Sequence, residues 1–259
     1  MPAELKSTSH GQTMVLTLSN PEYRNALGPD IYAAGVEALN VAESSVDVRS
    51  VVIVGEGAHF SAGGNLQRLL TNRQQPPHYQ AQSIEGLHSW IEAIRTFPKP
   101  VIAAVEGAAA GAGFSLALAC DFLVAASNAV FVMAYSNIAL SPDGGGSWSL
   151  SRSLPRQLVA ELMMFGERIA AQRLHELGVV NRLTDAGSAL TQALTLAASL
   201  NTRAPNALAS IKELINEASH NTLSSQLAAE RDHFVRNLHH ANAEIGITAF
   251  LSKQMPRFE

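Results

Sequence analysis

The sequence predicts an α/β (α+β) fold in which a strand-rich part precedes an all-helical tail. Val51–Val54 consists only of β-branched residues, which is typical of a strand buried on both faces. Val101–Ala104 is a second short apolar run, and a Pro-Lys-Pro segment leads the chain into it in an extended conformation. From Ala186 onwards the patterns are almost entirely helical. We therefore expect a core of residues 1–200 and a helical segment of residues 201–259.

The first hundred residues carry both strand and helix patterns. Thr13–Leu18 has the alternation of a strand, and an Asn-Pro-Glu turn follows it. Three helices are expected, over Pro29–Glu43, Asn65–Leu70 and Ile84–Phe97. Between the last two, Thr71–Gln82 is polar, contains Pro76 and Pro77, and has no periodicity. We expect this segment to be a mobile surface loop, of the kind that often lines a substrate pocket.

The second half of the chain is expected to be mainly helical. Arg168–Val180 predicts a helix that is closed by Gly178 and followed by a strand. Four further helices are expected, over Ala186–Leu200, Ala204–Ala218, Thr222–Leu238 and Ala241–Leu251. These helices carry apolar stripes and have little to pack on within the chain, which indicates an oligomer interface.

Composition excludes several classes of function. The chain has 259 residues, of which 47% are hydrophobic and 15% charged, so a sizeable core is expected. The net charge is −4 without a basic cluster, which gives no support to nucleic-acid binding. The single cysteine, Cys120, excludes an internal disulfide and is expected to be a small buried side chain. No metal-ligand pattern, secretory signal or membrane span is found, so we expect a soluble cytoplasmic protein without a metal.

Two strand-to-loop junctions rich in small residues form the candidate reaction centre. Gly107–Gly113 contains only small residues between Val101–Ala104 and an apolar helix expected over Phe114–Cys120. The first N–H groups of a helix have no intrahelical partner, and the helix dipole adds positive potential there. Phe60–Leu66 is a second Gly-rich stretch, and it follows Val51–Val54. Together the junctions could present two N–H groups to one oxygen that becomes negative during a reaction.

Together with a Pro-Asp-Gly-Gly segment that begins at Pro142, these stretches resemble the fingerprint of the crotonase (enoyl-CoA hydratase/isomerase) superfamily, from about Gly11 to Phe258. The resemblance implies a spiral of ββα units followed by a helical trimerisation segment, assembled as a homotrimer or homohexamer. It also implies an acyl-CoA substrate, with coenzyme A as part of the substrate and no permanently bound cofactor. By position, the N–H groups of Gly64 and Ala112 would hold the thioester carbonyl oxygen.

The resemblance also assigns the residues that would contact the substrate. Arg24 lies in a segment similar to the one that the family places against CoA, and it is a candidate phosphate partner, although taken alone it also fits a solvated turn. Asn65 stands where the family usually has Asp. Phe250 and Lys253 would reach CoA across a subunit interface. The expected substrate- and CoA-binding residues are Arg24, Ala26, Ala62, Asn65, Leu66, Gly111, Ser115, Tyr135, Pro142, Phe250 and Lys253.

The catalytic proton carrier is expected to be Asp143. Hydratases of the family use two glutamates, and the corresponding positions here hold Ser115 and Tyr135, neither of which suits a general base at neutral pH. The surroundings of Asp143 resemble those in the ring-epoxide/oxepin acyl-CoA isomerases of bacterial phenylacetate breakdown, a subgroup in which the Asp moves protons on the acyl chain. Taken alone, the Pro-Asp-Gly segment also fits an ordinary turn.

Three classes of function remain open at this point. The first is an acyl-CoA isomerase that shifts a double bond through Asp143. The second is an enoyl-CoA hydratase or acyl-CoA hydrolase with a non-standard base. The third is a non-catalytic binding protein of the same fold, against which the presence of Asp143 and of both junctions argues.

Overall fold

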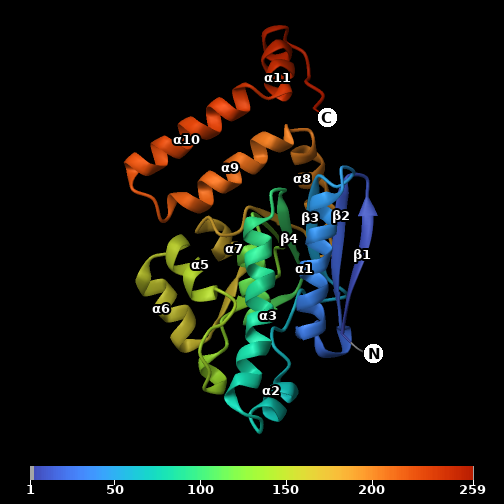
Figure 1. Cartoon of the computed structure of the whole chain (residues 1–259). Coiled ribbons are helices and arrows are strands. Elements are labelled where there is room, and N and C mark those ends of the chain that lie inside the picture. The colour runs from blue at the N-terminus through green and yellow to red at the C-terminus, as the bar shows by residue number, and fades with distance from the viewer. Residues whose placement is uncertain (1–2, 259) are drawn as a thin grey trace.

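The computed structural model describes residues 3–258, and its main layer is a six-stranded sheet (Figure 1). In spatial order its strands are β1 (Glu4–His10), β2 (Thr13–Ser19), β3 (Ser50–Gly55), β4 (Val101–Val105), β6 (Phe122–Ala126) and β9 (Arg182–Thr184). β1 is antiparallel to β2, and the other neighbours pair in parallel. On β3, Val51 and Ile53 face one apolar cluster, while Val52 and Val54 face another. The predicted burial of this strand on both faces is therefore confirmed.

A second, three-stranded sheet is built from β5 (Ala108–Ala110), β7 (Val130–Val132) and β8 (Arg168–Ala170). β5 follows β4 directly in the chain, and β7 follows β6 directly. The chain therefore alternates between a strand of the six-stranded sheet and a strand of the three-stranded sheet. After β5 the chain enters α4 (Ala112–Ala119). This alternation is the expected spiral of ββα units.

Helices cover both faces of the six-stranded sheet. α1 (Pro29–Ser44) and α3 (Pro77–Thr96) contact each other on one face, where Trp90 and Ile94 are fully buried. On the other face, α8 (Ala189–Asn201) packs its small apolar residues, such as Ala193 and Ala197, against β3, β4 and β6. The core that positions the site is therefore closed on both sides.

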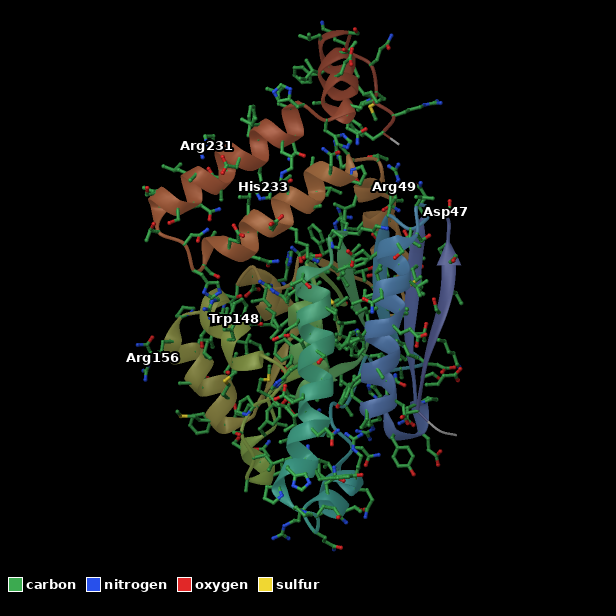
Figure 2. The ribbon with its side chains drawn as sticks, viewed as in Figure 1. Asp47, Arg49, Trp148, Arg156, Arg231 and His233 are labelled. Atoms are coloured by element: carbon green, nitrogen blue, oxygen red, sulfur yellow. The ribbon has the colours of Figure 1, made fainter. Side chains whose placement is uncertain are left out.

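The last helices, α9 (Pro205–Ala218), α10 (Leu223–Leu238) and α11 (Ala241–Leu251), extend beyond the sheets (Figure 1). α9 is docked on the core by Lys212, whose Nζ lies 2.8 Å from Asp121 Oδ2 and 2.9 Å from the carbonyl oxygen of Ile94. α10 packs on α9, and His233 between them is almost completely buried (Figure 2). The four predicted tail helices are present, although the first begins at Ala189 rather than Ala186.

The other helices are short: α2 (Leu66–Asn72), α5 (Gly146–Ser153), α6 (Arg156–Phe165) and α7 (Ala171–Glu176), with single turns η1 (Pro21–Tyr23) and η2 (Ser136–Ile138). Within residues 3–258, no helix is both long and apolar enough to cross a bilayer.

Two sequence-based expectations are wrong. Thr71–Gln82 is not a loop, because α2 continues to Asn72 and α3 already begins at Pro77. Proline suits the first position of a helix, and this first turn of α3 is exposed, so it carries no apolar period. Arg168–Val180 is not one helix either. Its first three residues form β8, which pairs with β7 and buries Ile169 opposite Phe131.

Candidate active site

The two Gly-rich junctions lie against each other in the folded chain. Ser61, in the junction after β3, pairs with Ala109 of β5 as an isolated parallel bridge. The N–H of Ser61 donates to the carbonyl oxygen of Ala108 at 3.1 Å, and the N–H of Ala110 donates to that of Ser61 at 2.9 Å. Residues about fifty positions apart in the chain are thereby held in register next to each other.

Glycine at two positions permits this close approach. Gly63 has φ +84°, and a Cβ there would lie 2.5 Å from the carbonyl oxygen of Ala110 and 3.1 Å from the N atom of Ala112. A Cβ on Gly113 would lie 2.7 Å from the carbonyl oxygen of Ser61. The 2.5 Å and 2.7 Å separations are too short for any side chain, so the sequence needs glycine at both positions.

The N–H groups of Gly64 and Ala112 are available to a ligand. Ala112 is the first residue of α4, where the helix supplies no acceptor for its N–H. Within the described residues, neither N–H donates to a backbone or side-chain acceptor. Both residues line the same cavity, and the dipole of the eight-residue α4 adds positive potential at its first turn. The geometry suits an oxygen that gains negative charge.

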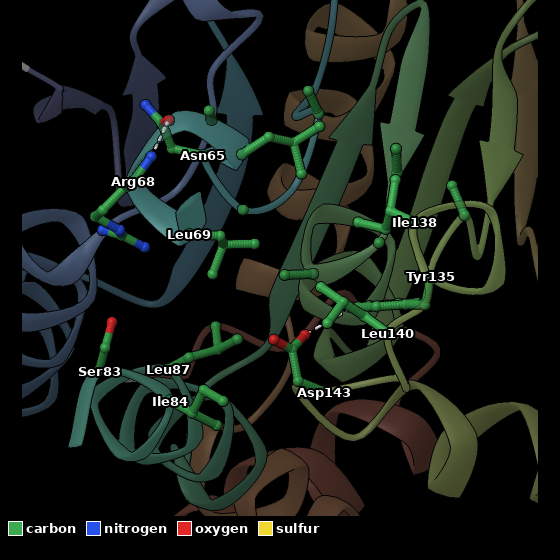
Figure 3. Close-up of a pocket in the computed structure, with 18 of the residues that line it drawn as sticks. Asn65, Arg68, Leu69, Ser83, Ile84, Leu87, Tyr135, Ile138, Leu140 and Asp143 are labelled. Atoms are coloured by element: carbon green, nitrogen blue, oxygen red, sulfur yellow. Dashed lines mark hydrogen bonds between the residues drawn. The ribbon is translucent and has the colours of Figure 1, made fainter. Parts of the chain in front are cut away.

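The cavity has a volume of about 670 Å³. Its lining is mixed: backbone and polar groups of the junctions on one side, and the apolar side chains of Leu69, Ile84, Leu87 and Leu140 on the others (Figure 3). The sequence-predicted residues that line it are Ala26, Ala62, Gly64, Asn65, Leu66, Gly111, Ala112, Tyr135, Pro142 and Asp143.

Asp143 faces this cavity and is held by Tyr135. The Tyr135 hydroxyl donates to Asp143 Oδ1 at 2.6 Å, and Figure 3 shows the carboxylate turned towards the cavity. Burial, followed by the neighbouring negative charge of Asp143, raises the pKa of Tyr135 well above its usual range. Tyr135 therefore remains a neutral hydrogen-bond donor. In the described part of the chain Oδ2 of Asp143 makes no hydrogen bond, so it is the oxygen free to exchange a proton.

Ser115 lies behind the cavity wall rather than on it. Its hydroxyl donates to the main-chain carbonyl oxygen of Asp143 at 3.0 Å, and the residue is 1% exposed. It does not line the cavity. The structure therefore places Ser115 as a support for the turn that carries Asp143, and not in contact with a substrate.

Asn65 has a clear local role. It is the N-cap of α2, and its Oδ1 accepts a hydrogen bond from the N–H of Arg68 at 3.0 Å. Asparagine and aspartate cap helices about equally well. Asn65 therefore keeps the start of α2 in place beside Gly64, as the usual Asp would.

Besides Ser115, three of the predicted substrate-binding residues do not line the cavity. Arg24 is exposed at the end of η1, with φ +50°. Phe250, on α11, is 83% exposed, and Lys253 follows in the exposed turn after that helix. Figure 1 shows α11 at the opposite end of the structure from α2, which is one of the elements around the cavity. A single copy of the chain therefore does not bring Phe250 or Lys253 to the site.

Sequence reasoning missed several polar residues that line the cavity. Tyr32 comes from α1, Arg68 from α2, and Ser83 and His88 from α3. No motif marks them, because their convergence depends on how three helices pack. The only usable signal is that Arg68 lies one helical turn after Gly64 of a recognisable junction. In the described chain, no group of three or more potential ligands could hold a metal ion.

Comparisons with known proteins agree with this architecture. A family model described as enoyl-CoA hydratase/isomerase matches residues 8–259. The chain is 36% identical over 246 residues to the 1,2-epoxyphenylacetyl-CoA isomerase of Escherichia coli K12, covering 95% of this chain and 94% of that protein. It is 31% identical over 258 residues to the 2,3-dehydroadipyl-CoA hydratase of the same organism, covering 99% of both. A crystal structure of an enoyl-CoA hydratase from Polaromonas sp. JS666 is 74% identical, with a TM-score of 0.98 over 98% of this chain and 99% of that one.

Proposed function

The chain belongs to the enoyl-CoA hydratase/isomerase family, and on that premise we propose that it shifts a double bond in the acyl chain of a CoA thioester. The observation that carries the proposal is the carboxylate of Asp143, which faces a cavity that Gly64 and Ala112, with their unpartnered N–H groups, also line. The proton would be moved by Asp143, and the charge would be held by Gly64 and Ala112.

Binding is proposed to use the two junctions. The thioester carbonyl oxygen accepts hydrogen bonds from the N–H groups of Gly64 and Ala112. CoA lies along Ala26, Ala62 and Leu66, of which the last two are exposed at the edge of the cavity. The acyl chain then extends past Asp143 between the apolar walls.

The proposed reaction is a proton transfer in two steps. Oδ2 of Asp143 takes a proton from a carbon of a 3-enoyl chain next to the thioester, and the electron pair moves onto the thioester oxygen as a dienolate. The two N–H groups stabilise that oxygen, which lowers the barrier. The same carboxyl group returns the proton to a carbon further along the chain, so that the double bond ends in conjugation with the thioester. The proton that Asp143 removes is the one that it returns, so no second acid is needed.

The absence of the usual glutamates supports isomerisation over standard hydration. Ser115 is buried behind the wall, and Tyr135 is kept protonated by its raised pKa. Neither can activate water as a base. A hydratase that uses Asp143 alone to activate water is the second candidate, and it is favoured by the two relatives described as hydratases, at 31% and 74% identity.

We also propose that residues 201–259 form an oligomerisation segment of a homotrimer or homohexamer. Large apolar side chains are exposed there, among them Phe234, Phe250 and Leu251. Exposed aromatic and aliphatic groups in such number indicate a surface that a partner covers. In that assembly Phe250 and Lys253 would approach the CoA of a neighbouring copy.

The test is a panel of enoyl-CoA substrates followed by the absorbance of the conjugated thioester. A rise of that absorbance with 3-enoyl substrates supports the isomerase. A fall with 2-enoyl substrates, together with formation of the 3-hydroxyacyl product, supports the hydratase instead. An unchanged absorbance over a wide panel would contradict both and favour a non-catalytic binding protein.

A further inference from the structure

Arg68 is a cation that lines the cavity without an anionic partner. The residue is half-buried on α2, and its Nε is buried with no hydrogen-bond partner. Within the described residues, no carboxylate forms an ion pair with it. A guanidinium that is partly removed from water and left unpaired is costly unless a ligand completes it.

The guanidinium of Arg68 lies beside Gly28 and Tyr32. The backbone at Gly28 leaves room for it, since a Cβ there would lie 2.6 Å from Arg68 Nη1. Tyr32 of α1, a buried residue whose side chain lines the cavity, is its neighbour: burial raises the pKa of Tyr32, and the Arg68 charge opposes that rise. Tyr32 thus remains a neutral donor beside the Arg68 cation.

This polar group lies at a different part of the cavity from the proton carrier. Figure 3 shows Arg68 and Ser83 on the side away from Tyr135, with Leu69, Ile84 and Leu87 towards Asp143. An acyl chain that starts at Gly64 and Ala112 and passes Asp143 would therefore meet apolar walls first and donors afterwards.

We propose that Arg68, assisted by the hydroxyl of Tyr32, binds a carboxylate at the remote end of the acyl group, so that the substrates are CoA thioesters of dicarboxylic acids. The guanidinium fork matches a carboxylate with two parallel hydrogen bonds. The apolar side chains around it strengthen this pairing by excluding water. This inference names the substrate class of the proposed reaction and rests on that function only for the direction in which the acyl chain runs.

The test compares the binding of two saturated acyl-CoAs of equal chain length, one ending in a carboxylate and the other in a methyl group, by titration calorimetry. Saturated thioesters need no proton transfer, so the result does not depend on whether the protein is an isomerase. The quantity is the ratio of the two dissociation constants, measured over a series of chain lengths. The wild-type protein should prefer the carboxylate at the length that reaches Arg68.

In Arg68→Gln this preference should fall about 10- to 100-fold, as expected for the loss of hydrogen bonds between charged groups. Arg68→Lys keeps the charge but loses the fork, so it should retain part of the preference. Arg73→Gln is the matched control, because Arg73 is exposed just after the same helix and does not line the cavity. It should keep the wild-type ratio.

Two results would overturn the inference. An equal loss of affinity for both thioesters in Arg68→Gln would mean that Arg68 contacts the CoA phosphates or only supports the fold. If the wild-type protein binds the methyl-ended thioester as tightly as the carboxylate-ended one at every chain length, a carboxylate subsite is excluded. In either case the proton chemistry of Asp143 would still be testable on neutral substrates.

Discussion

Replacing Asp143 by asparagine removes the proton acceptor while leaving the shape of the side chain almost unchanged. Asn Oδ1 can still accept the hydrogen bond that the Tyr135 hydroxyl gives at 2.6 Å. The bond from Ser115 goes to the main-chain carbonyl oxygen of residue 143, so the substitution does not alter it. The free energy of unfolding should therefore change by only about 1 kcal/mol, the difference between a charge-assisted and a neutral hydrogen bond.

The effect on turnover should be much larger. Positioned acid–base groups contribute about 10²–10⁴ in rate, which corresponds to about 3–5 kcal/mol of activation free energy. No other carboxylate lines the cavity in the described chain, and Tyr135 stays protonated, so no second carboxylate and no phenolate is in place to take over the proton transfer. Isomerisation by Asp143→Asn should fall by that factor while binding of the CoA thioester persists.

The assay follows both isomerisation of a 3-enoyl-CoA and exchange of its C–H protons with deuterated water. Exchange reports proton abstraction even when the product is not released, and thermal unfolding checks the fold. Asp47→Asn is the matched control, because Asp47 is an exposed carboxylate away from the cavity (Figure 2). Normal isomerisation by folded Asp143→Asn would refute the reasoning and would leave the Pro-Asp-Gly segment as a turn.

Three further predictions concern the oxyanion site, the assembly and the docking of α9. Ala112→Pro removes one N–H donor and should lower turnover about 10²–10³-fold, whereas Arg156→Pro, also at the first position of a helix, should not; full activity of folded Ala112→Pro would contradict the assignment. In sedimentation experiments the wild-type chain should have the mass of three or six copies, and Phe250→Glu should shift it towards the monomer; a monomeric wild type at micromolar concentration would exclude the interface. Lys212→Met should cost about 3–5 kcal/mol of unfolding free energy near pH 7, because it leaves the mostly buried carboxylate of Asp121, 20% exposed, without its ion-pair partner. Burial raises the pKa of Asp121, so the folded state binds its proton more readily than the unfolded state; stability of the variant should rise as the pH falls towards the usual range of Asp, and a loss independent of pH would contradict this explanation.

The close backbone approach of the two junctions could be predicted from the sequence because its signals are local. Small residues that follow an apolar β-branched run allow close backbone approach wherever they occur, and Gly63 and Gly113 do this in the fold. Asp143 could be singled out by the pattern around it. The helical segments of the tail were also predictable, since a period of 3.6 residues is visible in a single sequence.

Other features depended on tertiary contacts that no local pattern contains. The start of α3 at Pro77 and the strand β8 escaped prediction, because exposed helical turns lack an apolar period and edge strands are defined by their partner. Sequence reasoning placed Ser115 among the residues that contact the substrate, whereas packing places it behind Asp143.

By itself, then, the sequence determined most of the helices, the two buried strands Val51–Val54 and Val101–Ala104 and the two glycine-rich junctions, because each depends on residues adjacent in the chain. Through the family resemblance it also singled out Gly64, Ala112 and Asp143 as candidates. Only the tertiary structure decided how that carboxylate is held by Tyr135 and that Tyr32 and Arg68 meet at the opposite side of the cavity. These residues come from separate elements. Their hydrogen bonds and the raised pKa values of both tyrosines exist only when packing removes the groups from water.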